Sequence, residues 1–144
     1  KFVRAGYDAA GTLWMMSADV ADVFSFAPGG AATLLGPTGI GDGGDLVYFE
    51  GRGLVTWWPN RVGELVVTDG VAEVAELAPL VAEGSPSFSG ITSDGVALWV
   101  STIGGDLYRL ELGAEPSLEF RAATGHEVND LAPVVAPDGA CPSV

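Results

Sequence analysis

Cysteine, histidine and basic residues are all scarce in this sequence. Its 144 residues include one cysteine, one histidine and six lysines and arginines, against 19 aspartates and glutamates. The single cysteine, Cys141, cannot form a disulfide within the chain, so cysteine usage does not indicate a redox compartment. The single histidine, His126, leaves little material for metal sites that need histidine pairs or for a Ser-His-Asp triad.

The shortage of basic residues gives the chain a net charge of −13 at pH 7. Such a surface repels phosphate backbones and anionic lipid headgroups, so we expect neither nucleic-acid binding nor attraction to anionic membranes. Long apolar runs are also missing: none approaches the roughly 20 residues of a membrane span, and membrane insertion is not expected. The charge favours solubility and could attract cations or a basic partner. A solvated acidic surface is the simpler explanation.

Glycine and proline, by contrast, are frequent, with 21 and 9 copies, and apolar residues make up 48% of the chain. This composition indicates a folded chain with many short elements separated by turns. Three similar triplets recur at a spacing of 42 residues: Asp-Val-Phe at 22–24, Glu-Leu-Val at 64–66 and Asp-Leu-Tyr at 106–108. Repeats of about 40–45 residues, rich in glycine and short strands, are typical of the blades of a β-propeller.

Short apolar or alternating runs between turn signals predict strands along the whole chain. In chain order, the expected strands are 1–3, 12–17, 22–26, 31–35, 45–49, 53–59, 64–68, 71–77, 89–93, 96–101, 106–110, 117–120 and 128–136. The segment 71–77 also has the alanine and glutamate content of a helix, but its short length and its place in the repeat favour a strand. Asp69-Gly70, where both residues tolerate positive φ, predicts a tight hairpin turn.

The predicted fold is therefore all-β and propeller-like, a partial propeller of about three four-stranded blades with the start of a fourth. A single propeller segment is expected over 1–144, with blades at 1–36, 37–79 and 86–124 and another beginning within 128–144. A four-stranded sheet has two apolar faces, and neighbouring blades cover one another. Trp14, Tyr48 and Trp99 are expected at equivalent points of the three units, between blades.

The middle unit also resembles a known kind of repeat. Residues 63–70 (Gly-Glu-Leu-Val-Val-Thr-Asp-Gly) are similar to the Glu-Leu-Trp…Thr-Asp-Gly signature of propeller repeats in bacterial secreted and surface proteins. The signature tryptophan is Val66 here, and only the middle unit carries Thr-Asp-Gly. The resemblance implies a propeller fold and an extracellular or cell-envelope location. It implies no catalytic residues.

Three blades and a fraction do not close a ring, because closed propellers usually have four to eight blades. An incomplete ring exposes strand edges and apolar blade faces, which invite pairing with another chain. We therefore expect a partner: another protein chain, or a second copy that completes the ring.

Acidic loops are the first candidates for a site. Asp42 and Asp45 flank glycines in the loop 41–45 and offer carboxylates that suit Ca²⁺. The loop lacks the other ligands of a twelve-residue calcium loop, and a turn is the simpler explanation, so the predicted cofactor is none, with calcium as the alternative. Asp8, Asp94 and Asp138 each lie shortly before a glycine, and we expect them to hold turns by bonding backbone N–H groups.

The hairpin that contains Trp57, Trp58 and Arg61 is the candidate partner contact. Adjacent tryptophans in a strand point to opposite faces, so one of them is expected to be exposed unless a partner covers it. His126 beside Glu127 could act as a base or ligand, and Cys141 could pair with it as a nucleophile. An exposed loop histidine and a free thiol are the simpler interpretations.

These patterns favour a non-catalytic propeller segment that is secreted or envelope-associated and acts in protein binding or assembly. The alternative is a propeller hydrolase or lyase with a carboxylate or metal site in the central channel. Its ligands are expected near Asp8, Asp42 and Asp94, with His126 as a further candidate.

Overall fold

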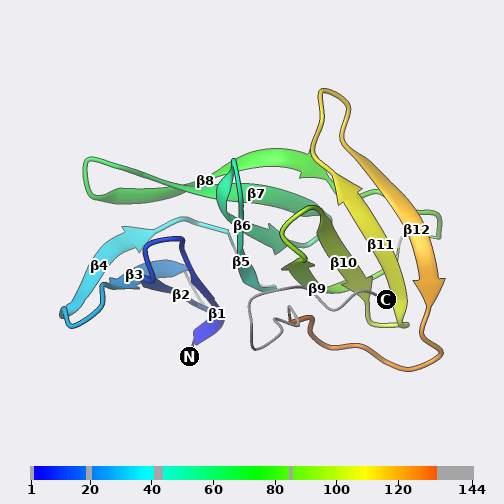
Figure 1. Ribbon diagram of the computed structural model, residues 1–144, viewed down its shortest axis with the longest axis horizontal. Helices are drawn as coiled ribbons and strands as arrows, with labels where there is room; N and C mark the ends of the chain where they lie inside the picture. The colour runs from blue at the N-terminus through cyan, green and yellow to red at the C-terminus, as the bar shows by residue number, and fades with distance from the viewer. Residues whose placement is uncertain (1, 19–20, 41–43, 85, 133–144) are drawn as a thin grey trace.

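A computed structural model describes residues 2–18, 21–40, 44–84 and 86–132 of the chain (Figure 1). Within these residues there are twelve strands and no helix, so no helix in this part of the chain is long and apolar enough to cross a membrane. The strands form three antiparallel sheets of four, each in simple up-and-down order. The prediction of an all-β chain with three four-stranded units is confirmed.

Each sheet is formed by four consecutive strands. The first sheet contains β1 (Phe2–Tyr7), β2 (Leu13–Ser17), β3 (Asp22–Phe26) and β4 (Ala32–Pro37). The second contains β5 (Leu46–Phe49), β6 (Gly53–Trp58), β7 (Arg61–Thr68) and β8 (Val71–Pro79). The third contains β9 (Phe88–Ser93), β10 (Leu98–Thr102), β11 (Asp106–Glu111) and β12 (Ser117–Ala123). The sequence predicts the three blades at 1–36, 37–79 and 86–124.

The first strand of each sheet lies toward the middle of the molecule. β1 packs beside β5, and β5 packs beside β9, whereas β4 and β12 lie at the two flanks (Figure 1). The sheets therefore stand like blades around a common axis, with the inner strands nearest to it. This is the radial arrangement of a propeller.

Two hydrophobic cores fill the spaces between the sheets. The core between the first and second sheets contains Met16, Ala21, Val23, Ile40, Leu46, Leu54, Leu65 and Ala72. The core between the second and third contains Val55, Trp57, Val62, Ala78, Leu80, Phe88, Ile91, Leu98, Val100, Tyr108 and Leu110. Alternation along each strand sends successive side chains into different cores, and the second sheet is covered on both faces for this reason.

Two details of the repeat differ from the sequence prediction. Asp22 and Asp106 are the first residues of β3 and β11, but Glu64 is the fourth residue of β7. The tight turn at Pro59-Asn60, with Asn60 at a φ of 59°, brings the start of β7 forward to Arg61. The even spacing of the three triplets is therefore wrong as a guide to equivalent positions in the middle unit.

The expected equivalence of three aromatics is also only partly right. Trp14 lies on β2 and Trp99 on β10, the second strands of their sheets, whereas Tyr48 lies on the innermost strand β5. Tyr48 pairs with Leu54 across the β5–β6 hairpin, so its place in the repeat was predicted wrongly. The second sheet has no tryptophan at the matching position. For the segment 71–77, the strand prediction is confirmed, because it lies in β8.

After β12 the chain turns back toward the axis. The Val128 amide donates to the Ile103 carbonyl at 3.3 Å, and a Cβ on Gly90 would lie 2.7 Å from the Leu131 nitrogen. Only glycine at position 90 allows this close approach of the returning chain to β9. Residues 128–132 form no regular strand, and the rest of the predicted fourth unit lies outside the described residues.

Candidate functional site

One face of the first sheet has no sheet packed against it within the described chain. Antiparallel pairing places side chains in rows across the strands, and two rows on this face are apolar throughout. One row is Tyr7, Leu13, Phe26 and Ala32, and the other is Ala5, Met15, Phe24 and Leu34. None of these eight residues belongs to either core or to the partly buried residues packed against the cores. We call these eight residues the open face.

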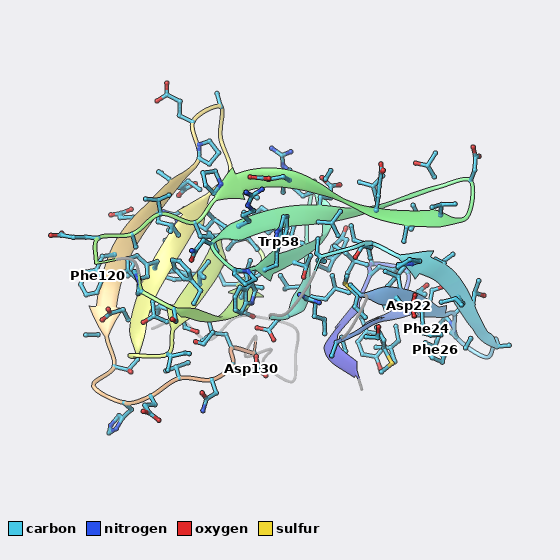
Figure 2. All side chains as sticks on the ribbon, turned by 180° about the vertical axis from the view of Figure 1, so that it is seen from behind. Asp22, Phe24, Phe26, Trp58, Phe120 and Asp130 are labelled. Atoms are coloured by element: carbon cyan, nitrogen blue, oxygen red, sulfur yellow. The ribbon has the colours of Figure 1, made fainter. Side chains whose placement is uncertain are left out.

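The open face is partly exposed to solvent. Tyr7 and Leu34 are 62% and 58% exposed, and the larger residues between them are half-buried. Figure 2 shows Phe24 and Phe26 together on the first sheet, at the opposite end of the molecule from Phe120. Asp22 borders the open face, since it is two residues before Phe24 on the same strand.

The matching face of the third sheet is buried except at its outer edge, where Phe120 is 55% exposed. Its rows are Ser93, Leu98, Leu110 and Leu118, and Ile91, Val100, Tyr108 and Phe120. These rows pack against Val55, Trp57 and Val62 of the second sheet. Leu98 is 0% exposed, whereas Leu13, at the corresponding place on the first sheet, is half-buried. The open face is thus built like a face that another blade covers.

The other face of the third sheet is polar by comparison. Across β9 to β12, one of its rows reads Thr92, Trp99, Arg109 and Glu119. Arg109 pairs with Glu111 at 3.0 Å and Arg121 with Glu119 at 2.6 Å. The returning chain at Leu131 lies against this face near Gly90. This face differs from the open face because it carries charged residues and lies against the returning chain.

The predicted turn role of Asp8 and Asp94 is confirmed, with one addition that the sequence prediction missed. The Asp94 carboxylate accepts hydrogen bonds from the Val96 and Ala97 amides at 2.9 and 2.7 Å. Its second oxygen accepts from the Trp99 indole at 2.8 Å. Asp8 bonds the Trp14 indole at the same distance. Each carboxylate therefore ties a turn to the tryptophan of the following strand.

These hydrogen bonds also set the acidity of the two carboxyls. Partial burial by itself would raise the pKa of Asp94, but hydrogen bonds from Ala97, Trp99 and Val96 outweigh it and hold the pKa below its ordinary value. In Asp8 the same opposition of burial and hydrogen bonds, led by Trp14, also lowers the pKa. Both groups remain charged at neutral pH, and their oxygens accept the hydrogen bonds of the turn.

A cavity of about 840 Å³ lies along the axis, where the three inner strands meet. We call it the axial pocket. Its polar lining consists of Arg4, Tyr7, Asp45, Tyr48, Glu50, Thr92, Ser93 and Asp130. Central cavities lined by inner strands are where ligands of propellers could bind. The sequence prediction had placed only Asp45 of these residues in a candidate site.

Asp45 is the most perturbed group of the pocket. One carboxylate oxygen accepts a hydrogen bond from the Ile91 amide at 2.8 Å, which links β5 to β9. Burial, and in addition the neighbouring Asp130 carboxyl, raise the pKa of Asp45 to about 7, against the opposing hydrogen bond from the Ile91 amide. At neutral pH, Asp45 is therefore divided between its protonated and ionised forms.

Of the predicted calcium ligands Asp42 and Asp45, only Asp45 lies within the described residues, so this pair stays a prediction. Within the described ranges, no cluster of three His, Cys, Asp or Glu side chains could hold a metal ion. Asp42 and Cys141 lie outside the described residues. His126 is exposed, and its backbone bonds the nearby Thr124 side chain. The pairing of His126 with Cys141 as base and nucleophile stays a prediction.

The Trp57/Trp58 hairpin is not an exposed contact. The two rings do point to opposite faces, but Trp57 is 7% exposed in one core and Trp58 is half-buried against the other. The second sheet is covered on both sides, so the expectation of an exposed tryptophan is wrong. Close packing explains the glycine at position 44, where a Cβ would collide with the Trp57 ring. Arg61 is exposed and pairs with Glu76 at 2.6 Å.

Two solved structures share this fold. Selenomethionine-substituted virginiamycin B lyase from Staphylococcus aureus is 14% identical, with a TM-score of 0.64. A catalytically inactive variant of that lyase with quinupristin is 13% identical, with a TM-score of 0.62. In each case the match covers 90% of this chain and 44% of the lyase chain. No family model and no curated protein matches the sequence.

The lyase is a β-propeller, and this likeness shows the fold of the present chain: a partial propeller of three four-stranded blades. At 13–14% identity it shows the fold alone. The chain spans less than half the length of the solved structures that it matches.

Proposed function

We propose that this chain is a non-catalytic propeller segment, secreted or associated with the cell envelope, that acts in protein–protein interaction or assembly. Its contact surface is the open face of the first sheet. Another chain or a second copy covers this face in the working protein. The location rests on the resemblance of residues 63–70 to repeats of secreted and surface propellers.

The open face carries the proposal. Eight apolar side chains lie in two unbroken rows, without a charged residue among them. In the corresponding rows of the third sheet, the residues of β9 to β11 are buried against a neighbouring blade, whereas Phe120 on β12 is exposed. Contiguous exposed apolar surface of this kind marks interaction sites more often than scattered hydrophobic residues do. Val96, 81% exposed in the turn between β9 and β10, is such a scattered residue and serves as a control.

Two neighbouring methionines provide the test. Met15 lies on the open face, and Met16 is 0% exposed in the core on the other side of β2. In the dilute purified chain, peroxide should oxidise Met15 at least about tenfold faster than Met16, as mass spectrometry of peptides can measure. In protein isolated gently from its native source, Met15 should be as protected as Met16. Equal Met15 reactivity in the two preparations would mean that nothing covers the face, and the proposal would fail.

Dye binding gives a second measurement on the chain alone. An apolar dye such as anilinonaphthalene sulfonate should bind the wild-type chain, and Met15→Glu should remove most of this binding by placing a charge in the centre of the face. Val96→Glu introduces the same charge at an exposed apolar position elsewhere and should leave dye binding unchanged. Near-ultraviolet circular dichroism of both variants would establish that they remain folded.

The axial pocket favours a second function, that of a hydrolase or lyase with carboxylates at its centre. Asp45, with a pKa raised by burial to about 7, could exchange a proton with a bound substrate near neutral pH. The structural neighbour is a lyase, and one of its structures contains quinupristin. The test is turnover of virginiamycin B or quinupristin by the chain, with and without added divalent cation. Activity that Asp45→Asn abolishes would support this function, and no product at high enzyme concentration would refute it for these compounds.

A further inference from the structure

We propose that the open face binds the open face of a second copy of this chain. The two copies would be related by a two-fold axis that runs parallel to the strands, between β2 and β3. This inference rests on the proposed function and specifies its partner. A face-to-face contact of this kind is isologous, because each copy contributes the same residues.

The other free face of the molecule does not suit the open face. Blades in this chain stack with the Trp14 side of one sheet against the opposite side of the next. A second copy that continued this stacking would bring its open face to the Trp99 side of the third sheet. That side carries Arg109 and Glu119 in its central row, and Leu131 lies over it at Gly90. Covering it would bury charges and displace the chain's own continuation.

The open face matches itself at its corners. A two-fold axis along the strands places β1 over β4 of the second copy and keeps each row opposite the same row. Tyr7 then lies over Ala32 of the other copy, and Leu34 lies over Ala5. Large side chains meet small ones at all four corners, which is the arrangement that allows two surfaces to pack without voids or overlaps.

The centre of the face matches itself as well. The same axis places β2 over β3 of the second copy, so that Leu13 lies over Phe26 and Met15 over Phe24. Each aromatic ring thus meets an aliphatic side chain or a thioether, and sulfur–aromatic contacts are favourable. Two sheets packed in this way would lie about 10 Å apart, as in a β-sandwich.

Charge and size set the strength of this contact. The eight side chains are uncharged, but Asp22 borders the face and each copy carries a net charge of −13. Salt should therefore strengthen the association by screening repulsion, whereas it would weaken binding to a basic partner. From strand spacing and rise, the face measures about 15–20 Å across the strands, and its two rows lie about 7 Å apart along them. That is smaller than a standard interface, so we expect a weak dimer, with a dissociation constant of about 10–100 µM.

Sedimentation equilibrium over a wide range of concentrations tests the association itself. The wild-type chain should approach twice its monomer mass at several hundred micromolar, more readily at high salt. Met15→Glu should weaken the dimer at least about tenfold, and Val96→Glu should leave it unchanged. A wild-type chain that stays monomeric at the highest concentration and salt would overturn the inference, as would association that Met15→Glu does not affect.

A pair of substitutions tests the two-fold geometry. Ala32→Leu adds bulk under the Tyr7 ring of the other copy and should weaken association about tenfold. Tyr7→Ala leaves a gap at the same corner and should also weaken it. The double variant Tyr7→Ala/Ala32→Leu exchanges large for small and should recover to within about threefold of the wild type. If the two effects simply add, or if Ala32→Leu strengthens association, the copies do not meet in this way.

Oxidation of Met15 separates this inference from the proposed function. If a second copy covers the face, Met15 should be protected from oxidation in the pure chain at high concentration. The Tyr7→Ala variant, which still contains Met15, should lose this protection. If Met15 is protected only in protein from the native source, another protein covers the face: the proposed function stands and the second copy is ruled out. If Met15 is reactive both in the pure chain at high concentration and in protein from the native source, both proposals fail.

Discussion

The first and third sheets present the same side of a blade to very different surroundings. In the third sheet this side contains Leu98 and Val100, which are 0% exposed against the second sheet. In the first sheet, Leu13 and Met15 stand at the corresponding places and remain partly exposed. Apolar alternation in a strand therefore indicates that one face of the strand is to be buried. It does not show that the described chain itself contains the residues that bury this face.

The largest expected difference concerns matched leucines on the two sheets. Leu98→Ala should lower the free energy of unfolding by about 2–5 kcal/mol, because it leaves a cavity in a filled core. Leu13→Ala should lower it less, by about 1–2 kcal/mol in the dilute chain, because part of the Leu13 side chain already contacts solvent. Urea unfolding of both variants measures this. Equal losses would show that the open face is covered even in the isolated chain.

A smaller effect concerns the two turns that tie an aspartate to a tryptophan. Asp94→Ala and Asp8→Ala each remove hydrogen bonds to two amides and one indole, and each should cost about 1–2 kcal/mol of unfolding free energy. Both carboxyls have a pKa lowered in the folded state, so their contribution is present above pH 4 and is lost as the pH falls further. Thermal melting from pH 7 down to pH 2 would test both points. Unequal losses at pH 7 would break the equivalence of the first and third sheets.

Asp45, at the axis between the first and third sheets, should give the stability of the chain the opposite pH dependence. The pKa of Asp45 is raised from an ordinary 3.8 to about 7 in the folded chain. The folded state therefore holds a proton that the unfolded state has lost, and stability from this group should fall as the pH rises from about 4 to 7. Asp45→Asn should remove this decline in urea unfolding, whereas Asp69→Asn, in the exposed turn before β8, should retain it. A wild-type chain whose stability does not fall in this range would contradict the assignment.

The smallest effect is expected on the polar face of the third sheet. Glu119→Gln removes the partner of Arg121 in an exposed ion pair, which should change the unfolding free energy by no more than about 0.5 kcal/mol. It should also leave self-association unchanged, because that face is not part of the proposed contact. A clear loss of dimer in sedimentation would move the contact from the first sheet to the third.

Much of the architecture could be predicted from local pattern. The alternation in Asp22–Phe26 and the Asp69-Gly70 turn predict β3 and the β7–β8 hairpin, and both are present. The register of the middle unit could not be predicted, because the Pro59-Asn60 turn brings the start of β7 forward without changing the spacing of similar triplets. The tryptophan hairpin failed for a related reason: sequence shows that adjacent rings point to opposite faces, but not that both faces are covered.

The candidate sites could also be predicted only in part from the local sequence. Alternating Leu13 and Met15, with Phe24 and Phe26 on the next strand, held a signal for the open face, but only pairing across β2 and β3 aligns them in rows. Asp45 was recognised as an acidic loop residue, yet its perturbed pKa depends on Ile91 and Asp130, which are 46 and 85 positions further along. No spacing within the loop contains that information.

The sequence by itself determined the all-β class, the short strands and their turns, since these depend on side-chain alternation and on residues that tolerate positive φ within a few positions. The tertiary structure alone decided which blade faces are covered, which aspartates hold turns and which meet at the axis. Those outcomes depend on contacts between sheets far apart in the chain, and burial by a distant neighbour changes exposure and acidity without any mark in the local sequence.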